Sequence, residues 1–199
     1  MGRLPIKLIA IGNERVGKTS LLTACALGEF HPYSMVQIFD EPPQDIMFND
    51  IPIRLAMYEA AYSNLEYIAP LRHSLLYPDT DVILLCFSLA DPESYKHVRD
   101  YWYPEISTHA PNVPVILVGM KMDLLYDEET LTRLRERNMA PIDATDGETM
   151  CREINADKYM DCSSLQLMGV KEILGEAIGL VLQKYCHVNC LENKQCVLF

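Results

Sequence analysis

Residues 11–20 read Ile-Gly-Asn-Glu-Arg-Val-Gly-Lys-Thr-Ser, and Gly12 to Thr19 fit the pattern G-x-x-x-x-G-K-S/T. In a loop of this kind the glycines let successive backbone N–H groups point at phosphate oxygens. Lys18 would reach the terminal phosphates, and the Thr19 hydroxyl would bind Mg²⁺. The stretch therefore predicts a phosphate-binding loop.

The sequence on either side of the loop supports this prediction, because apolar runs and helical patterns alternate along the whole chain. That alternation is typical of βαβ units around a mostly parallel sheet with helices on both faces. We expect strands over residues 6–11, 45–48, 51–58, 82–87, 113–118 and 159–162, with a hairpin turn at Asn49-Asp50. We expect helices over residues 19–27, 91 to about 108, 127–137 and 169–185, with another capped by Thr145 and Glu148. The loop falls between the first strand and the first helix, as the pattern requires.

Composition narrows the class of protein. A chain of 199 residues is expected to form one domain, and its net charge of −11 argues against a nucleic-acid partner. The longest apolar run, residues 82–87, is too short to span a bilayer, and no signal peptide is evident. Seven cysteines without a C-x-x-C pair indicate the reducing cytosol.

Glu14 is unusual in a loop that holds anions. A carboxylate about 5 Å from a phosphate would cost on the order of 3 kcal/mol at an effective dielectric constant near 20. Alternatively, Glu14 swings outward as a solvated side chain or pairs with Arg15.

Several stretches taken together resemble the Rho family of small GTPases, within the Ras superfamily. They are G-N-E-R-V-G-K-T-S-L-L at 12–22, Y-P-D-T-D-V-I-L-L-C-F-S at 77–88, W-Y-P-E-I at 102–106, V-P-V-I-L-V-G at 113–119, D-C-S-S at 161–164 and C-V-L-F at 196–199. The resemblance implies the P-loop small-GTPase fold over residues 1–185, a Rho-type insert near 127–137, and a flexible tail over 186–199. It further implies a monomer that binds GTP or GDP with Mg²⁺ and signals to the actin cytoskeleton from the cytoplasmic face of a membrane.

The resemblance also implies which residues contact the nucleotide. These are Gly12, Asn13, Glu14, Arg15, Val16, Gly17, Lys18, Thr19, Ser20, Phe30, Lys121, Asp123, Ser163 and Ser164, with Thr19 also the metal ligand. The family recognises guanine through the pattern N/T-K-x-D, whereas residues 120–123 read M-K-M-D. Met120 cannot supply the polar contact expected there, and Leu165 replaces a lysine of the family pattern.

Both switch segments depart from the family pattern. The magnesium-binding threonine of the first switch aligns with Gln37, and no threonine occurs between Thr23 and Thr80. The second switch should read D-T-A-G-Q, but residues 59–63 read E-A-A-Y-S, and residues 45–118 contain neither glycine nor glutamine. Glu59 is one methylene longer than the aspartate and would still reach Mg²⁺ through a water.

These losses predict that intrinsic GTP hydrolysis is very slow or absent, because phosphoryl transfer depends on positioning and electrostatics. Cycling between two shapes is then also in question, so the activity as a GTPase is left open. Two functions follow: a GTP-binding signalling protein, or a scaffold that binds partners without a nucleotide cycle. A third alternative, an ATP-dependent kinase or ATPase, is disfavoured by Asp123.

The last four residues, 196–199, fit the prenylation pattern C-a-a-X, with Cys196 as the modified residue. A single lipid usually needs a second membrane signal, and no polybasic stretch precedes it. Cys186 and Cys190 are candidate palmitoylation sites, the alternative being two unmodified thiols.

Overall fold

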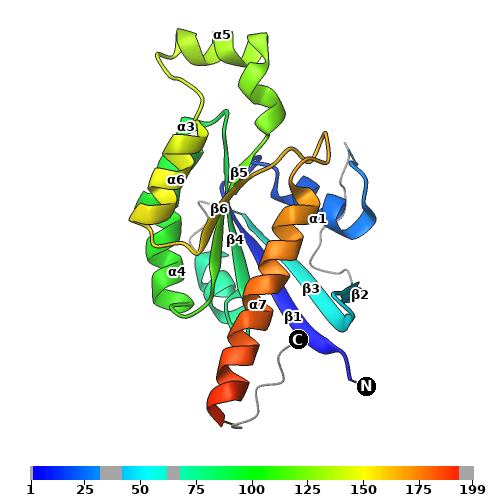
Figure 1. Cartoon of the computed structure of the whole chain (residues 1–199). Coiled ribbons are helices and arrows are strands. Elements are labelled where there is room, and N and C mark those ends of the chain that lie inside the picture. The colour runs from blue at the N-terminus through cyan, green and yellow to red at the C-terminus, as the bar shows by residue number, and fades with distance from the viewer. Residues whose placement is uncertain (1, 32–41, 62–67, 193–199) are drawn as a thin grey trace.

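The computed structural model describes residues 2–31, 42–61 and 68–192. Its centre is a six-stranded sheet with the strand order β2-β3-β1-β4-β5-β6 (Figure 1). The strands are β1 (Leu4–Gly12), β2 (Gln44–Phe48), β3 (Ile51–Ala61), β4 (Val82–Ser88), β5 (Val115–Met120) and β6 (Lys158–Asp161). β2 pairs antiparallel with β3, and the other neighbouring strands are parallel. The predicted α/β class with a mostly parallel sheet is confirmed.

Helices cover both faces of this sheet (Figure 1). One face packs against α1 (Lys18–Leu27) and α7 (Val170–Glu192), and the other packs against α3 (Pro92–His97), η3 (Val98–Trp102), α4 (Tyr103–His109) and α6 (Ala144–Glu153). Successive residues of β1 point to opposite faces, so Leu8 belongs to the first core and Ile9 to the second. Because both faces are buried, β4 and β5 are continuous apolar runs, as the sequence pattern predicts.

The hairpin between β2 and β3 turns where the sequence predicts. Phe48 pairs with Ile51, so the loop contains only Asn49 and Asp50. Both loop residues have positive φ, 47° and 63°, which the favoured two-residue hairpin turn requires. Asparagine and aspartate tolerate this conformation better than other residues that carry a Cβ atom.

The helix expected from residue 91 to about 108 begins as predicted but is not regular. Asp91 caps it by accepting a hydrogen bond from the Glu93 N–H at 3.2 Å, and Pro92 lies in the first turn. The helix then passes from α3 into the π-helical segment η3 and continues as α4 to His109. The π-helical segment includes Trp102, which lies in the core.

The predicted cap of α6 is wrong by two residues. Asp143 and Asp146, instead of Thr145 and Glu148, form the reciprocal cap: the Asp146 N–H donates to Asp143 Oδ1 at 2.9 Å, and the Asp143 N–H donates to Asp146 Oδ2 at 3.2 Å. Because the helix begins at Ala144, Thr145 already lies in its first turn.

The last helix, α7, is longer than predicted. It was expected to end at residue 185 but continues to Glu192, so residues 186–192 are helical. The segment contains no glycine or proline that would end a helix there. Residues 193–199 lie outside the described part of the chain. Among the described residues, no helix has both the length and the apolar character needed to cross a membrane.

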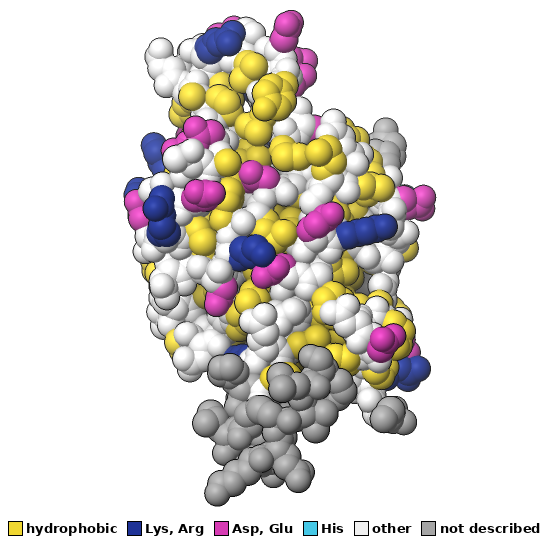
Figure 2. Space-filling view, in the orientation of Figure 1, with side chains coloured by type: hydrophobic (Ala, Val, Ile, Leu, Met, Phe, Trp, Pro, Cys, Tyr) yellow, Lys and Arg dark blue, Asp and Glu magenta, His cyan; other side chains and the backbone are white. Residues whose placement is uncertain are grey.

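The charged stretch near residues 127–137 forms α5 (Glu128–Glu136), which projects beyond the body of the molecule (Figure 1). Asp127 caps it by accepting a hydrogen bond from the Thr130 N–H at 2.8 Å. Acidic and basic side chains are interspersed with hydrophobic ones on the face shown in Figure 2. The exposed large hydrophobic residues of the described chain include Tyr126, Leu165, Leu167 and Met168.

Candidate functional site

The predicted site residues gather at one edge of the sheet, where the parallel strands have their carboxyl ends. Gly12 ends β1, Glu59 lies near the end of β3, and Met120 ends β5. Lys18 begins α1 directly after the loop that follows β1, and Asp123 lies in the short 3-10 helix η4 (Met122–Tyr126) that follows β5. In open α/β sheets, ligands bind in the crevice outside these carboxyl ends.

The two glycines of the loop meet different steric requirements. Gly12 has φ 149°, and a Cβ atom there would lie 2.1 Å from the Cys86 carbonyl oxygen, so no other residue fits without a shift of the backbone. Gly17 has φ 116° and directly precedes α1. These positions allow the loop to turn tightly from β1 into the helix, as the sequence pattern predicts.

Lys18, the first residue of α1, is buried beneath the loop backbone, with 2% of its side chain exposed. Its Nζ donates hydrogen bonds to the Gly12 carbonyl oxygen at 3.1 Å and the Asn13 carbonyl oxygen at 2.6 Å. Burial lowers the pKa of the Lys18 ammonium, while the nearby Glu59 carboxylate opposes this shift by favouring the charged form. The loop thus holds a cation in a shielded position, where its attraction to an anion is strong.

Glu59 lies directly against this cation. Its Oε1 is 3.7 Å from Lys18 Nζ, and its Oε2 accepts a hydrogen bond from the Thr19 hydroxyl at 2.5 Å. Glu59 pairs with Ala10 in the β1–β3 register, two residues before the loop begins. One carboxylate therefore contacts both side chains that the sequence assigns to phosphate and Mg²⁺.

The beginning of α1 has the character of an anion site. No side chain caps its N-terminus, and its first turn contains no acidic residue. Its free N–H groups and the helix dipole favour a bound anion. Glu14 and Arg15 are both exposed, so the Glu14 carboxylate points to solvent in agreement with the outward alternative.

The residues expected to bind the base form a second cluster beside the loop. Lys121 Nζ donates to the Arg15 carbonyl oxygen at 2.6 Å, so its side chain crosses the phosphate loop. Asp123 Oδ1 accepts a hydrogen bond from the Ser163 hydroxyl at 2.5 Å. The buried Ser164 Oγ has no hydrogen-bond partner among the described residues, which leaves a polar atom for a bound ligand.

Met120 occupies the position where the family pattern has a polar residue. It is buried, accepts a weak hydrogen bond from the Cys162 thiol at 3.5 Å, and its Cε lies 3.2 Å from where a Gly17 Cβ atom would be. Met120 therefore fills the space between β5 and the phosphate loop with apolar atoms instead of a hydrogen bond.

Asn13 connects the loop to the opposite helical layer, a contact that the sequence did not predict. Its Oδ1 accepts a hydrogen bond from Trp102 Nε1 at 2.9 Å, and its Nδ2 lies 2.8 Å from His97 Nδ1. Trp102 lies 89 residues and His97 lies 84 residues from Asn13 in the sequence, so no local pattern could have identified these partners.

A second unpredicted cluster holds the segment that follows the second-switch residues. This segment comprises α2 (Ile68–Leu71) and η2 (Arg72–Leu76). Arg72 is buried, donates to both Glu105 oxygens at 2.7 Å, and lies over the Trp102 ring at 5.1 Å. Tyr77 also donates to Glu105 at 2.7 Å, and the His73 and His109 rings stack with centroids 3.7 Å apart. These contacts fix η2 against α4.

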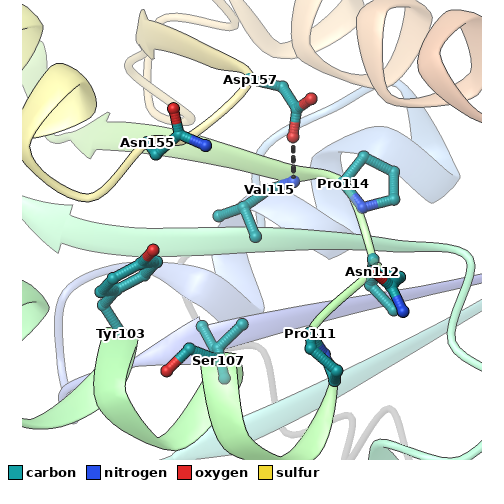
Figure 3. Close-up of a pocket in the computed structure, with 11 residues that line it drawn as sticks. Tyr103, Ser107, Pro111, Asn112, Pro114, Val115, Asn155 and Asp157 are labelled. Carbon is teal, nitrogen blue, oxygen red and sulfur yellow. Dashed lines mark hydrogen bonds between the residues drawn. The ribbon is translucent and has the colours of Figure 1, made fainter.

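A separate cavity of about 300 Å³ lies at the other end of β5 (Figure 3). The α4 side chains Tyr103 and Ser107 and the later residues Asn155 and Asp157 line it, and Asp157 accepts a hydrogen bond from the Val115 N–H at 2.7 Å. None of the predicted nucleotide-binding residues lines this cavity.

The donor set at the phosphate loop fits Mg²⁺ together with a phosphate. Mg²⁺ prefers oxygen ligands and is usually held by one or two carboxylates with substrate phosphates. Thr19 and Glu59 supply such oxygens. Over residues 2–31, 42–61 and 68–192, no group of three or more His, Cys, Asp or Glu side chains could hold a metal ion by itself.

The remaining predicted site residues differ in how deeply they are buried and in whether the structure describes them. Val16 is buried, Ser20 is half-buried in α1, and Phe30 is half-buried beyond the end of that helix. Cys186 is exposed on α7, whereas the side chain of Cys190 is not described. Gln37, residues 62–67 and Cys196 lie outside the described residues.

The model of the Ras family matches residues 7–183 of this chain. The matched region contains the phosphate loop, the cluster around Asp123 and all six strands of the sheet except the first three residues of β1. The chain therefore belongs to the Ras family of small GTPases.

Proposed function

We propose that this protein is a Rho-like GTP-binding protein that acts in signalling at a membrane and hydrolyses GTP very slowly or not at all. Ras-family proteins in general bind guanine nucleotides and Mg²⁺. The observation that carries the proposal has two parts. Lys18 and Thr19 of the phosphate-binding pattern lie together at one edge of the sheet, and the Arg72–Glu105 ion pair joins η2 to α4.

Retention of nucleotide binding is supported by Lys18 and Thr19 at the uncapped start of α1, and by Asp123 beside Ser163. In this assignment Lys18 and the loop backbone bind the phosphates, Thr19 binds Mg²⁺, and Asp123 with Lys121 binds the guanine. A bound Mg²⁺ ion would neutralise charge on the phosphates. The protein's own groups orient the nucleotide and shield it from water.

Two observations support the loss of hydrolysis: the missing glycine and glutamine of the second switch, and the buried Arg72–Glu105 ion pair. Residues 45–118 contain no glycine or glutamine, so the glycine that would present its N–H to the γ-phosphate and the glutamine that orients the attacking water are both missing. In addition, the Arg72–Glu105 pair ties η2 to α4 in the described structure. A tied segment opposes the rearrangement through which small GTPases sense the γ-phosphate.

The Rho subfamily and the membrane tether rest on the insert and the C-terminus. α5 lies where the Rho-type insert is expected, and Cys196 begins the C-a-a-X sequence. Prenylation of Cys196, with palmitoylation of Cys186 or Cys190, would give two lipid signals. Replacing Cys196 by Ser should release the protein from membranes, and hydroxylamine-sensitive labelling should fall when Cys186 and Cys190 are both replaced.

The ligand itself gives the direct test of this proposal. Mass spectrometry of nucleotide released from the purified protein should identify GDP or GTP, and titration with labelled GDP should give saturable binding. A Lys18→Met variant should lose this binding, whereas Lys184→Met on α7 should keep it. Adenine nucleotide in place of guanine nucleotide would contradict the proposal.

A second candidate is a nucleotide-independent scaffold, and one observation favours it. Lys18 and Thr19 donate hydrogen bonds to the protein's own oxygen atoms, namely two loop carbonyls and the Glu59 carboxylate. A wild-type protein that carries no nucleotide and binds neither GDP nor GTP in the titration would support the scaffold.

A further inference from the structure

We propose that His97 is a proton-sensitive positioning residue for the phosphate loop. Its neutral imidazole holds the Asn13 side chain in place, and protonation of the ring releases that side chain and weakens nucleotide binding. The inference rests on the proposed guanine-nucleotide site and adds to it a control by pH.

Three side chains form a hydrogen-bonded chain that runs from η3 through the loop to the end of α3. Trp102 Nε1 lies 2.9 Å from Asn13 Oδ1, and Asn13 Nδ2 lies 2.8 Å from His97 Nδ1. An indole nitrogen can only donate, so the Asn13 oxygen must face Trp102 and the Asn13 NH₂ group must face His97. Trp102 therefore fixes the direction of both hydrogen bonds.

This direction sets the protonation state that His97 needs. Because the Asn13 NH₂ group donates, His97 Nδ1 must accept, and the proton of the neutral ring is on Nε2. A protonated ring carries a hydrogen on both nitrogens, so two donors would face each other across 2.8 Å. Turning the Asn13 amide over would satisfy His97 but would place the NH₂ group against the Trp102 N–H. With His97 protonated, Asn13 keeps one of these two partners and loses the other.

The chain lies where its loss would affect the loop. Trp102 is buried, and Asn13 and His97 are half-buried, so water competes only partly for these hydrogen bonds. Asn13 directly follows Gly12, where a Cβ atom would lie 2.1 Å from the Cys86 carbonyl oxygen of β4. The loop thus packs on β4 at one residue and is joined to the helical layer at the next. Release of Asn13 loosens the loop, and a loop that must be ordered on binding gives a weaker affinity.

Several other ionisable groups belong to the elements that meet at this contact. They are Glu14, Arg15 and Lys18 beside Asn13, Glu93, Lys96, Arg99 and Asp100 beside His97, and Arg72, Tyr101 and Glu105 around Trp102. Histidine is the side chain whose charge ordinarily changes between about pH 5 and 8. A response in that range that disappears in a His97 variant therefore identifies His97 as its source.

The Trp102 indole gives a direct readout, because Trp102 is the only tryptophan of the chain. Proton–nitrogen NMR spectra of the purified protein would be recorded from about pH 8 to about pH 5.5. The single indole N–H resonance of wild type should shift with a one-proton profile. His97→Gln should abolish the shift, since the glutamine oxygen still accepts from Asn13 but takes up no proton. His109→Gln, which replaces an exposed histidine on α4, should titrate like wild type.

GDP affinity at two pH values measures the consequence for binding. At about pH 5.5 wild type should bind labelled GDP about fivefold more weakly than His97→Gln, whereas at about pH 7.5 the two should agree. Comparing the variants at the same pH and Mg²⁺ concentration removes any effect of pH on the nucleotide itself. His97→Lys presents donors but no acceptor, so it should bind GDP weakly at both pH values. If His97→Gln fails to fold, His97→Asn supplies an acceptor on a shorter side chain.

The outcomes distinguish this proposal from the proposed function. An indole resonance with the same pH profile in wild type and His97→Gln would overturn the role of His97, whether or not GDP binds. Equal GDP affinities of these two proteins at about pH 5.5 would overturn the control of binding and leave guanine binding intact. Absence of GDP binding in every variant at both pH values would contradict the proposed function, and the indole titration would still decide whether His97 holds Asn13.

Discussion

Arg72 and Glu105 form a two-contact ion pair in the interior of the protein. Arg72 Nε lies 2.7 Å from Glu105 Oε1, and Arg72 Nη2 lies 2.7 Å from Glu105 Oε2. Their side chains are 2% and 9% exposed. Parallel contacts of this kind are the strong form of an arginine–carboxylate pair, and burial increases the cost of breaking them. The pair joins η2 to α4, so it links the region after the second switch to the rigid helical layer.

Replacing Glu105 by Gln should lower the free energy of unfolding by about 3 kcal/mol, because it removes the charge that offsets the buried guanidinium. Urea unfolding monitored by circular dichroism would measure the change. Asp100→Asn is the matched control, since Asp100 pairs with Arg99 at the surface and both side chains are more than half exposed. Equal effects of the two substitutions would contradict a structural role for the buried pair.

Stability should fall in acid because of the same carboxylate. Burial alone would raise the pKa of Glu105, but hydrogen bonds from Arg72 and Tyr77 outweigh burial and hold its pKa below the usual value. A lowered pKa in the folded state means that the unfolded chain takes up the proton first. The contribution is therefore complete above the unfolded pKa of about 4.3 and is lost as pH falls through the folded pKa. The pH dependence of unfolding below about pH 4.3 should be shallower in Glu105→Gln than in wild type.

The elements that sequence predicted best are those with local signals. The loop from Gly12 to Thr19 and the turn at Asn49 and Asp50 depend on backbone conformations that few residue types adopt. The helix ends were predicted less well: the N-cap of α6 is Asp143, two residues before the predicted Thr145. An aspartate is as good a helix cap as a threonine, so Asp143 and Asp146 could form the reciprocal cap in place of Thr145 and Glu148.

The contacts that support the site were not predictable for a different reason. Arg72 meets Glu105 and Asn13 meets Trp102 only because the sheet order brings distant segments together. The π-helical turn η3, which contains Trp102, has no periodicity that distinguishes it from a regular helix. The nucleotide-binding residues were proposed by resemblance, and the structure adds the protein atoms that the side chains of Lys18, Thr19, Lys121 and Asp123 contact.

Trp102 is the only tryptophan of the chain, and its indole N–H donates to Asn13 in the phosphate loop. Binding of GDP should therefore change the intrinsic fluorescence, because the loop and the indole share this hydrogen bond. In an Asn13→Ala variant the response should be much smaller. The variant should also be about 1–2 kcal/mol less stable, through loss of the contacts to Trp102 and His97. An unchanged fluorescence response in Asn13→Ala would show that the loop is not coupled to η3 through this residue.

Met120→Asn should lower the free energy of unfolding and raise the affinity for GDP. The substitution removes a buried apolar side chain that packs beside Gly17, at a cost of about 2 kcal/mol in unfolding free energy. It also supplies the polar contact that the family pattern expects next to the base, which should tighten GDP binding about tenfold. Met120→Leu is the matched control, because it keeps the apolar volume and should leave the affinity unchanged. Equal GDP affinities for the Asn and Leu variants would contradict the role assigned to this position.

In the proposed function the protein binds GTP without hydrolysing it at an ordinary rate. The decisive experiment is single-turnover hydrolysis, with protein in excess over γ-labelled GTP and with Mg²⁺ present. The fraction of bound GTP and the released phosphate would be followed together over several hours. We expect the label to stay bound as GTP throughout. Release of phosphate at about 10⁻⁴ s⁻¹ or faster, the range of an unstimulated small GTPase, would contradict it.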